Sequence, residues 1–487
     1  MCPDIPVFSM TQTQYPSVIV WVDDSGIAHA RDTKTGNVIA EGSDHASVLQ
    51  AALYSKTGRR VSVRGTLTLS SIVGVPGDTV LDLSEATLKL PDTLSSYSEI
   101  LRIAGDNVLI EGGLFDGGAN GVSTASRAVN CRGYSNVTVS GAKFQNILVG
   151  VEAWGKNIRV HSCDFPSNVR YCVNNYSGSV SDLTVESCNA YAGILLNIDG
   201  LNVPSGSVAE NIIVRGCRSY AAGQFGIAIA TENNFTVRNV HVSDCQFLGP
   251  HPEAFHAEDP GIAGVYISNS YFKGVVEMGY GTSAVNDIEI QNVVIEAGDY
   301  ANKHGMELTP GTYALVKNVI VRKAPLHGVK ITGGSGYVYL ENVIVEDPSG
   351  QTNYTYYGFW IANRAKMVNC AVYTPGGKVP LRGAHIGGQY SELHNCEIRG
   401  SDHGLFVNAD DVKVVGGNYY TGYKGTIYIN GKQRTKIVAS HIARQPSPYA
   451  GVYEASGSDY TKIIDAVFYG TGQDAVLVGT NSKNLVL

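Results

Sequence analysis

The sequence predicts an all-β chain wound as a parallel β-helix, a solenoid in which short strands stack coil upon coil. A motif recurs at a period of roughly 21–30 residues: a β-branched pair ending in Cys or Asn, a polar break, and Gly before alternating apolar residues. Almost no stretch carries an apolar stripe at helical spacing. The 56 Gly, the 28 Tyr and a charged fraction of only 16% suit a turn-rich β chain.

Two copies illustrate the motif. In one, Asn211–Cys217 leads to Gly226–Ile229, and in the next, Val240–Cys245 leads to Phe255–Ala257. Each Gly-apolar unit alternates over a few residues, which predicts a short strand. Such repeats bury their apolar faces only by stacking on their neighbours, so we expect one solenoid of roughly 14–16 coils.

Two elements near the start are expected to form a cap. The segment Val18–Arg31 predicts a hairpin around an Asp-Ser-Gly turn. The segment Ser43–Tyr54 opens with capping residues and carries apolar residues such as Leu49 on one face, which predicts a helix. We therefore expect residues 1–60 to be the cap and residues 61–487 to be the β-helix domain.

Charge and hydropathy exclude some classes of partner. The net charge of −7 leaves no basic footprint for nucleic acid. No apolar run approaches the length that crosses a bilayer. We expect neither a nucleic-acid partner nor a membrane span.

The cysteines predict a buried stack. Cys163, Cys188, Cys217 and Cys245 fall at the same phase of successive repeats, which places them about 4.8 Å apart in the core. They lack Cys-x-x-Cys spacing, so a zinc site is not expected, whereas disulfides between coils remain open.

The segment Asp44–Ala52, followed by Arg60–Leu69, is similar to the capping helix and first coil of a known superfamily. With its repeats, the chain resembles the pectin-lyase-like superfamily of right-handed parallel β-helices, which includes pectate lyases, polygalacturonases and phage tailspike depolymerases. The resemblance runs from about residue 43 to the end and implies right-handed coils. The superfamily hosts hydrolases, lyases, epimerases, esterases and adhesins, and no complete catalytic motif can be carried over.

Function is therefore sought in the outward positions of the Gly-apolar strands, which we call the outward row. Along the chain the row comprises Asn130, Glu152, Val173, Leu195, Ala228, His256, Glu277, Glu307, Lys330, Trp360, His385 and Phe406. It is mixed or apolar at first and then reads His-Glu-Glu-Lys-Trp-His on six consecutive coils. We expect the active site at these six coils, although a solvated ion-pair ladder worth roughly 0–1 kcal/mol per pair is the simpler interpretation.

Glu277 and Glu307 lie on adjacent coils and predict a glycoside hydrolase. Their backbones are expected about 4.8 Å apart, close to the roughly 5–5.5 Å between the carboxyl groups of retaining glycosidases. One carboxylate would attack or stabilise the anomeric carbon, and the other, with a raised pKa, would protonate the leaving oxygen. The sequence leaves open which is which.

The resemblance also implies a polysaccharide lyase as an alternative, because several β-helix lyases use Lys or Arg beside carboxylate-bound Ca²⁺. Lys330 would take the C5 proton of a uronate, and Arg364 would neutralise charge or act as the acid. Glu277 and Glu307 would then be the calcium ligands, and His256 is a second candidate base. The hydrolase is slightly favoured and requires no cofactor.

The residues expected to bind substrate are Trp360, His385, Arg364, Tyr280, Tyr357, Glu258 and Asp259. Aromatic faces suit the apolar C–H side of a pyranose ring. Glu258 and Asp259 would replace Glu277 if the register of that coil shifted by one residue.

A non-enzymatic glycan-binding adhesin or virion spike is a further alternative. The localised charged row favours an enzyme, since an adhesin would spread its polar and aromatic residues over many coils. The expected partner is a polysaccharide, and the chain would act outside the cell or on a cell or virion surface. It would be a monomer or homo-oligomer, and a trimer if it is tailspike-like.

Overall fold

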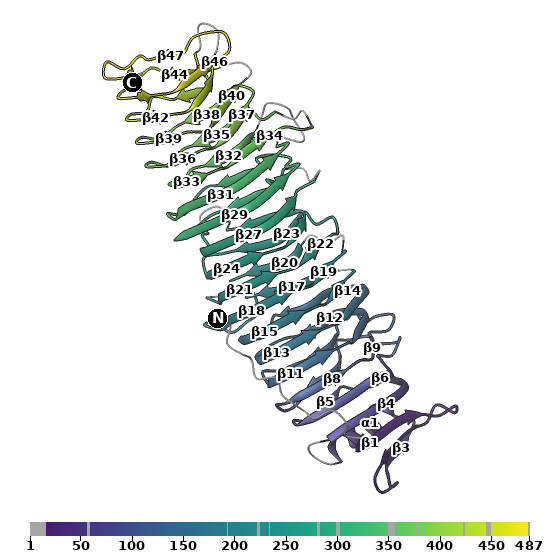
Figure 1. The fold of residues 1–487 in the computed structure, drawn as a ribbon. Coiled ribbons are helices and arrows are strands. Elements are labelled where there is room, and N and C mark those ends of the chain that lie inside the picture. Colours follow the sequence, from purple (N-terminus) through teal and green to yellow (C-terminus); the bar gives the residue numbers. More distant parts are fainter. Residues whose placement is uncertain are drawn as a thin grey trace. The chain divides into compact units, whose positions relative to one another are not determined.

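The computed structural model describes residues 16–55, 59–191, 193–221, 225–232, 234–279, 283–298, 302–348, 356–376, 379–421, 424–444 and 450–485. The chain forms two compact units, unit 1 (Met1–Val173) and unit 2 (Asn174–Leu487). Parallel β-strands build both, and the solenoid has about 16 turns, so the predicted β-helix is confirmed (Figure 1). Among the described residues, no helix has the length and hydrophobicity needed to cross a membrane.

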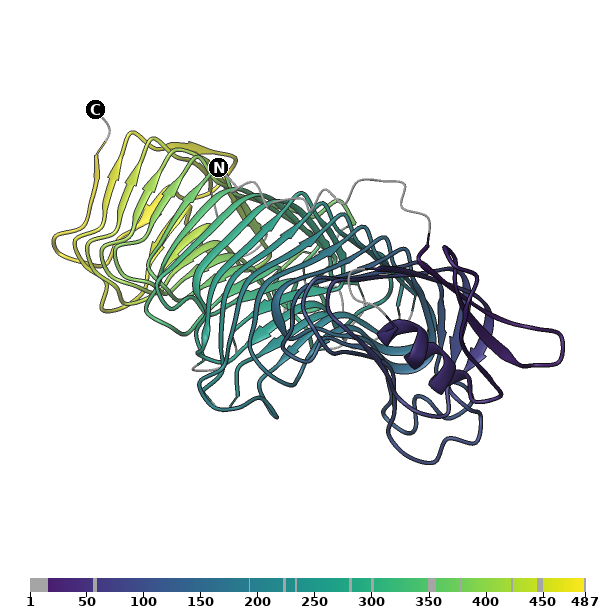
Figure 2. The same cartoon turned by 90° about the horizontal axis from the view of Figure 1, so that it is seen from below.

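Unit 1 begins with the predicted hairpin and helix, both of which are confirmed. Strands β1 (Val18–Val22) and β2 (Ala28–Asp32) pair antiparallel, and β3 (Val38–Gly42) pairs with β2. Helix α1 (His45–Tyr54) buries its apolar face and packs against β2 and β3 (Figure 2). Because β1 also pairs in parallel with β4 (Arg59–Thr68), the hairpin is hydrogen-bonded into the first coil.

Parallel strands complete unit 1. They are β5 (Val73–Val75), β6 (Thr79–Lys89), β7 (Glu99–Ile103), β8 (Val108–Glu111), β9 (Leu114–Asp116), β10 (Arg127–Asn130), β11 (Ser135–Ser140), β12 (Lys143–Glu152), β13 (Gly155–His161) and β14 (Asp164–Asn175), the last of which ends in unit 2. Inside, the rings of Phe115, Phe144 and Phe165 stack with centroids 5.1 and 4.8 Å apart. Identical residues at one phase thus form a continuous apolar ladder.

Unit 2 has three parallel sheets, and sheet 1 contains the predicted Gly-apolar strands. Its strands are β17 (Ile194–Asp199), β20 (Phe225–Ala230), β23 (Glu253–Glu258), β26 (Val275–Met278), β28 (Met306–Leu308), β30 (Val329–Ile331), β32 (Tyr357–Ile361), β35 (Arg382–Ile386), β38 (His403–Val407), β41 (Ile427–Ile429), β44 (Val452–Glu454) and β47 (Ala475–Val476).

Sheets 2 and 3 form the other faces of unit 2, and three long strands run through both. Sheet 2 contains β15 (Val180–Glu186), β18 (Val208–Arg215), β21 (Thr236–Ser243), β24 (Ile262–Ser268), β27 (Asn286–Glu296), β29 (Tyr313–Arg322), β31 (Tyr337–Glu346), β33 (Ala365–Val368), β36 (Glu392–His394), β39 (Lys413–Val415), β42 (Lys436–Val438), β45 (Lys462–Ile464) and β48 (Lys483–Leu485). Sheet 3 contains β16 (Asn189–Ala190), β19 (Arg218–Ser219), β22 (Gln246–Phe247), β25 (Tyr271–Lys273), β34 (Ala371–Tyr373), β37 (Glu397–Gly400), β40 (Asn418–Thr421), β43 (His441–Ala443) and β46 (Val467–Tyr469), and it continues through β27, β29 and β31.

The glycine of the repeat motif is required by close packing. A Cβ atom on Gly328 would lie 2.2 Å from Cγ1 of Val345, and one on Gly305 would lie 2.2 Å from Cγ1 of Val321. No relaxed side chain fits at such separations. Glycine is therefore required directly before β28 and β30, because valines of sheet 3 fill the space behind it.

The asparagines of the motif stabilise the bend inside the long strands. Asn292, Asn318 and Asn342 have φ values of 54, 53 and 54°, a left-handed conformation that Asn tolerates. Asn318 Nδ2 donates to Asn292 Oδ1 at 3.0 Å, and Asn342 Nδ2 donates to Asn318 Oδ1 at 2.9 Å. This ladder fixes the same corner on successive coils.

The predicted cysteine stack is confirmed within unit 2. Cys188, Cys217 and Cys245 are buried and directly precede residues that pair in register. The backbone N–H of Cys188 donates to Sγ of Cys217 at 3.5 Å. These thiols are part of the packed core.

Candidate functional site

The outward row is confirmed over the coils that were predicted to carry function. In sheet 1 the paired residues run, coil by coil, Ala228, His256, Glu277, Glu307, Lys330, Trp360, His385 and Phe406. In unit 1, Asn130 pairs with Glu152 as predicted. The six-coil series His-Glu-Glu-Lys-Trp-His is thus a continuous line of neighbours.

One earlier member of the row was assigned wrongly. Asn197, and not Leu195, pairs with Ala228. The two residues are two positions apart and share one face of the strand, so alternation alone does not decide which is in register. Asn197 Nδ2 donates to Asn174 Oδ1 at 2.8 Å, so the row is already polar there.

The row is not a solvated ladder. The side chain of Glu277 is only 4% exposed, that of Glu307 12% and that of Lys330 20%. Charged groups are rarely buried to this extent unless they are paired or functional. The interpretation as an exposed ion-pair ladder is therefore wrong for these coils.

A second series of polar and aromatic residues accompanies the row from His256 to Phe406, three positions before each row residue except Glu277, which Gly274 precedes. This flanking row comprises Glu253, His304, His327, Tyr357, Arg382 and His403. Tyr357 pairs with Arg382, and Arg382 pairs with His403. Of these residues only Tyr357 had been predicted, although the repeated spacing of three residues is visible in the sequence.

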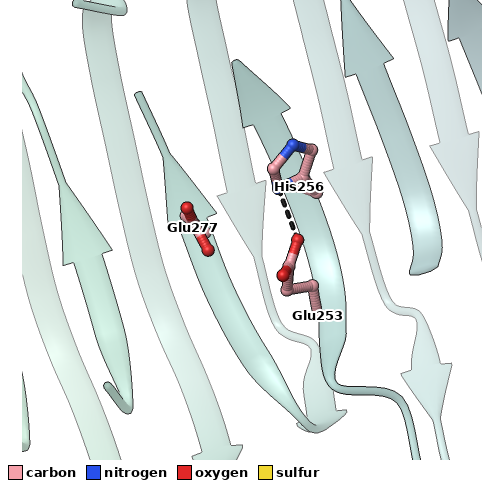
Figure 3. Close-up of side chains that lie close together, drawn as sticks. All are labelled: Glu253, His256 and Glu277. Atoms are coloured by element: carbon pink, nitrogen blue, oxygen red, sulfur yellow. Dashed lines mark ion pairs between the residues drawn. The ribbon is translucent and has the colours of Figure 1, made fainter. Parts of the chain in front are cut away.

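Four titratable side chains lie together at the first two coils of the six-coil series. We call them the carboxylate cluster: Glu253, His256, Glu277 and Lys303. Glu253 and His256 lie on β23 and Glu277 on the neighbouring β26 (Figure 3). Nδ1 of His256 is 2.6 Å from Oε2 of Glu253 as an ion pair. The ammonium of Lys303 pairs with Glu253 and, at 3.2 Å, with Oε2 of Glu277. Lys303 comes from the insert before β28, and it was not predicted.

The cluster separates the pKa values of its two carboxyl groups. Burial and the neighbouring Glu253 raise the pKa of Glu277, and Lys303 only partly opposes them. Burial also tends to raise the pKa of Glu253, but contacts with His256 and Lys303 outweigh it and lower that pKa. Burial tends to lower the pKa of both cations, yet their carboxylate partners raise it. The cluster thus shifts the pKa values of its two carboxyl groups in opposite directions, with that of Glu277 raised and that of Glu253 lowered.

Glu307 lies one coil further along in a second charged group. Lys330 Nζ donates to Oε1 of Glu307 at 2.6 Å, and Nε2 of His304 lies 3.7 Å from Oε2. The rings of His304 and His327 stack with centroids 4.9 Å apart. Burial lowers the pKa of His304 to about 3, with Lys330 and Lys303 adding to the effect. Burial, with His304 and Lys330, lowers the pKa of His327 to about 2, so both imidazoles are neutral near pH 7.

Aromatic rings continue the site beyond Lys330. The ring of Trp360 lies 4.7 Å from that of His327 and 5.7 Å from Nζ of Lys330. The guanidinium of Arg382 lies 5.0 Å from the Tyr357 ring and 3.4 Å from the Phe406 ring. Aromatic and cationic groups therefore share this part of sheet 1.

Arg382 also affects the pKa of His385, the next residue of the outward row after Trp360. Its Nη1 donates to Nδ1 of His385 at 3.0 Å. Burial, and then the charge of Arg382, lower the pKa of His385 to about 4. Burial lowers the pKa of His403 to about 4, with Arg382 again contributing. Two neutral imidazoles, those of His385 and His403, thus lie near the half-buried cation Arg382.

Several predicted site residues lie elsewhere or play other parts. Arg364 lies over the rings of Tyr337 and Tyr390, at 5.5 and 6.0 Å, and the structure does not bring it to Lys330. It comes four residues after the row position, where the chain has already turned towards sheet 2.

The reserve carboxylates do not replace Glu277, because His256 pairs with Glu277; the register irregularity between β23 and β26 lies earlier, between Glu253 and Phe255. Glu258 is 44% exposed and lies 3.3 Å from Nε2 of His256. Asp259 has a φ of 84° and accepts the backbone N–H of Thr231 at 3.1 Å, which is a turn role. Tyr280 lies outside the described residues.

The residues present do not fit the predicted calcium ion. Among the described residues, Glu253, His256 and Glu277 each offer a ligand atom, all within 4.8 Å of one another. Ca²⁺ prefers 6–8 oxygen ligands, whereas this group offers one imidazole nitrogen and two carboxylates already paired with Lys303. The predicted second ligand, Glu307, is likewise held by a lysine.

A family model agrees with the architecture of part of the chain. A family model described as "right handed beta helix region" matches residues 194–345. Among solved structures, the A-module of a mannuronan C-5 epimerase of Azotobacter vinelandii is 15% identical, covering 90% of this chain and 95% of that chain at a TM-score of 0.25. The tailspike of Escherichia coli bacteriophage HK620, solved with a pentasaccharide, is 14% identical, covering 93% and 79% at a TM-score of 0.34. No curated protein matches the sequence.

The family match lies within unit 2 and includes the strands that carry His256, Glu277 and Glu307. The coils, their register and this match agree with the resemblance to the pectin-lyase-like superfamily that the repeats predicted. Residues 194–345 thus resemble the right-handed β-helix family, and the chain folds as a parallel β-solenoid.

Proposed function

We propose that the protein is a carbohydrate-active enzyme that cleaves glycosidic bonds of a polysaccharide at sheet 1 of unit 2, as a glycoside hydrolase. One observation carries this proposal. Glu277, a buried carboxyl group with a raised pKa, lies one coil from Glu307, a carboxylate held by Lys330. Carboxyl groups with different environments on adjacent strands are what acid-assisted glycoside cleavage requires.

In this mechanism Glu277 is the general acid. Because its pKa is raised, Glu277 retains its proton to higher pH than an ordinary glutamate, and it would give this proton to the oxygen of the leaving sugar. Glu307 supplies negative charge at the anomeric carbon, as nucleophile or stabiliser. Adjacent strands are about 4.8 Å apart, which favours the retaining geometry of roughly 5–5.5 Å and net retention of configuration.

The neighbouring groups position these two carboxyls. Lys303 holds Glu277 at 3.2 Å, and the carboxylate of Glu253 pairs with both Lys303 and His256. On the other side, a sugar chain packed on Trp360 would extend along the row to Glu307. The polysaccharide would thus cross successive coils of sheet 1.

A polysaccharide lyase is the second candidate, and Arg382 is the observation that favours it. Its guanidinium lies between aromatic rings and donates to a neutral His385, and no carboxylate of the described residues forms an ion pair with it. Such a cation could neutralise a uronate in the role first assigned to Arg364. The candidate bases support the lyase less well, because His256 has a raised pKa and Lys330 donates to Glu307.

The test is cleavage of a panel of neutral and uronate polysaccharides, following reducing ends and the ultraviolet absorbance of unsaturated products together. We expect new reducing ends without that absorbance. Glu277→Gln and Glu307→Gln should each lower the rate about 10²–10⁴-fold. The same change at Glu289, on sheet 2, is the matched control and should leave the rate unchanged.

The other outcomes are distinct. Unsaturated products that depend on Arg382 would replace the hydrolase with the lyase. Binding of a glycan without any cleavage would make the protein an adhesin. Full activity in Glu277→Gln would contradict the assignment of the general acid.

A further inference from the structure

Four lysines stand in register on sheet 2, at the last coils of unit 2, and we call them the lysine row: Lys413, Lys436, Lys462 and Lys483. Each opens its strand, and each pairs with the next one along the coils. The strands are β39, β42, β45 and β48, of which β39 and β42 are labelled in Figure 1. At about 4.8 Å per coil the row extends for about 14 Å.

The lysine row forms no ion pair with a carboxylate of the described residues. On the preceding coils the same position alternates in sign, since Lys366 pairs with Glu392 and Glu392 with Lys413. From Lys413 onward the alternation stops, so Glu392 is the single acidic neighbour in line with four lysines. Lys436, Lys462 and Lys483 are exposed.

The acidic groups nearest in sequence are engaged elsewhere. Asp411 forms a two-pronged pair with Arg434 at 2.6 and 2.8 Å. Asp459 accepts hydrogen bonds from the backbone and side chain of Asn481, both at 2.9 Å. Glu392 accepts from His394 at 2.8 Å. Glu392 also interacts electrostatically with Lys413, whereas Lys436, Lys462 and Lys483 have only lysines as neighbours in register among the described residues.

Like charges directly opposite one another on neighbouring strands repel, so this arrangement is unfavourable without a partner. It also opposes the net charge of −7 of the whole chain. Beside it lies an aliphatic strip, two residues further along the same strands: Val415, Val438, Ile464 and Leu485. On these strands the positively charged lysine row therefore lies next to the apolar aliphatic strip.

We propose that the lysine row and the aliphatic strip bind a linear anionic polysaccharide that runs along the coils of sheet 2. The ammonium groups pair with its acidic groups, and the strip packs against the C–H faces of its sugar rings. Single-stranded nucleic acid fits less well, because the strip contains no aromatic ring on which bases could stack. The proposal does not depend on the hydrolase, because the candidate active site lies on sheet 1.

The test is affinity electrophoresis of the full chain in gels that contain dextran sulfate, with uncharged dextran as the matched polymer. We expect retardation only by dextran sulfate, and we expect it to weaken as salt is added. Lys436→Ser with Lys462→Ser should weaken binding about tenfold at low ionic strength. The matched control is Lys143→Ser with Lys156→Ser, which removes two exposed strand lysines of unit 1 and should bind like the wild type.

A variant with Lys436→Arg and Lys462→Arg keeps the charge and should keep the affinity. The Ser variant should melt no lower than the wild type, since it loses repulsion and no ion pair. Equal loss in the unit 1 control, or unchanged binding in the Ser variant, would overturn the proposal. Tighter, lysine-dependent binding of single-stranded DNA at the same salt would overturn the choice of a polysaccharide.

Discussion

Lys303 is predicted to be the residue that makes the buried carboxylate cluster stable at neutral pH. The change Lys303→Met keeps most of the side-chain volume and removes only the ammonium group. Glu253 and Glu277, 7% and 4% exposed, would then keep a single cation, His256, between them. Any stability that Lys303→Met loses should therefore come from the missing charge and not from poorer packing.

The size of the effect follows from burial. Removing one partner of a buried pair costs about 3–5 kcal/mol. The side chain of Lys303 is 31% exposed, and water replaces part of its interaction, so we expect about 2–3 kcal/mol at pH 7. Adding Glu253→Gln should reduce the cost to about 1 kcal/mol, because the pKa of Glu253 is lowered and the amide that replaces its carboxylate carries no charge that needs a partner.

The pH dependence has a defined sign. The pKa of Glu253 is lowered in the folded protein, so its contribution is present above its unfolded pKa and is lost as pH falls through the folded value. Glu277 has a raised pKa, so its contribution is present at low pH and is lost as pH rises through the folded value. The cost of Lys303→Met should thus be largest at pH 7 and shrink towards pH 4.

Hydrogen exchange of peptides from β23 and β26 is the suitable assay, because solenoids can open locally without global unfolding. Lys317→Met is the matched control: Lys317 pairs with Glu341 at 3.1 Å, with side chains 39% and 26% exposed. We expect at most about 1 kcal/mol there. Equal effects of the two lysine changes, or no rescue by Glu253→Gln, would refute the reasoning.

Three further predictions concern packing, pH and metal. Gly328→Ala should destabilise unit 2 by about 1–3 kcal/mol in thermal unfolding, because the added Cβ atom would lie 2.2 Å from Cγ1 of Val345. The control is Gly387→Ala, whose Cβ atom would have its nearest neighbour at 3.5 Å. An unchanged stability of Gly328→Ala would show that the backbone at this corner can relax. Because the pKa of His327 is lowered to about 2, the free energy of unfolding of the wild type should fall as pH drops below 6.5, by up to about 1.4 kcal/mol per pH unit for this group. In His327→Gln the unfolding free energy should depend less steeply on pH. Equal pH dependence in the two proteins would contradict the argument from burial. The rate of polysaccharide cleavage should be unchanged by EDTA. A loss of activity that Ca²⁺ restores would favour the lyase over the hydrolase.

The outward row could be predicted because two local features determine it. The glycine of each repeat marks the start of a strand, and alternation with a period of two assigns the outward face. This was sufficient to align His256, Glu277 and Glu307. It failed at Leu195, where two candidate residues shared the outward face.

Other parts of the site depend on contacts that the repeat does not encode. Lys303 lies in an insert, where no stacked neighbour fixes the chain path in advance. Arg364 and Arg382 have the same chemistry, but only Arg382 precedes its row position by the three residues that place it in the flanking row. The burial of Glu277 likewise follows from surrounding side chains and not from its position in a strand.

The most direct test of the account is the protonation state of Glu277, measured by difference infrared spectroscopy of the wild type against Glu277→Gln across a pH titration. The account predicts a protonated carboxyl band, absent from the variant, that persists above the ordinary glutamate pKa of 4.5. A band that disappears at or below that pKa would contradict the assignment of Glu277 as the general acid.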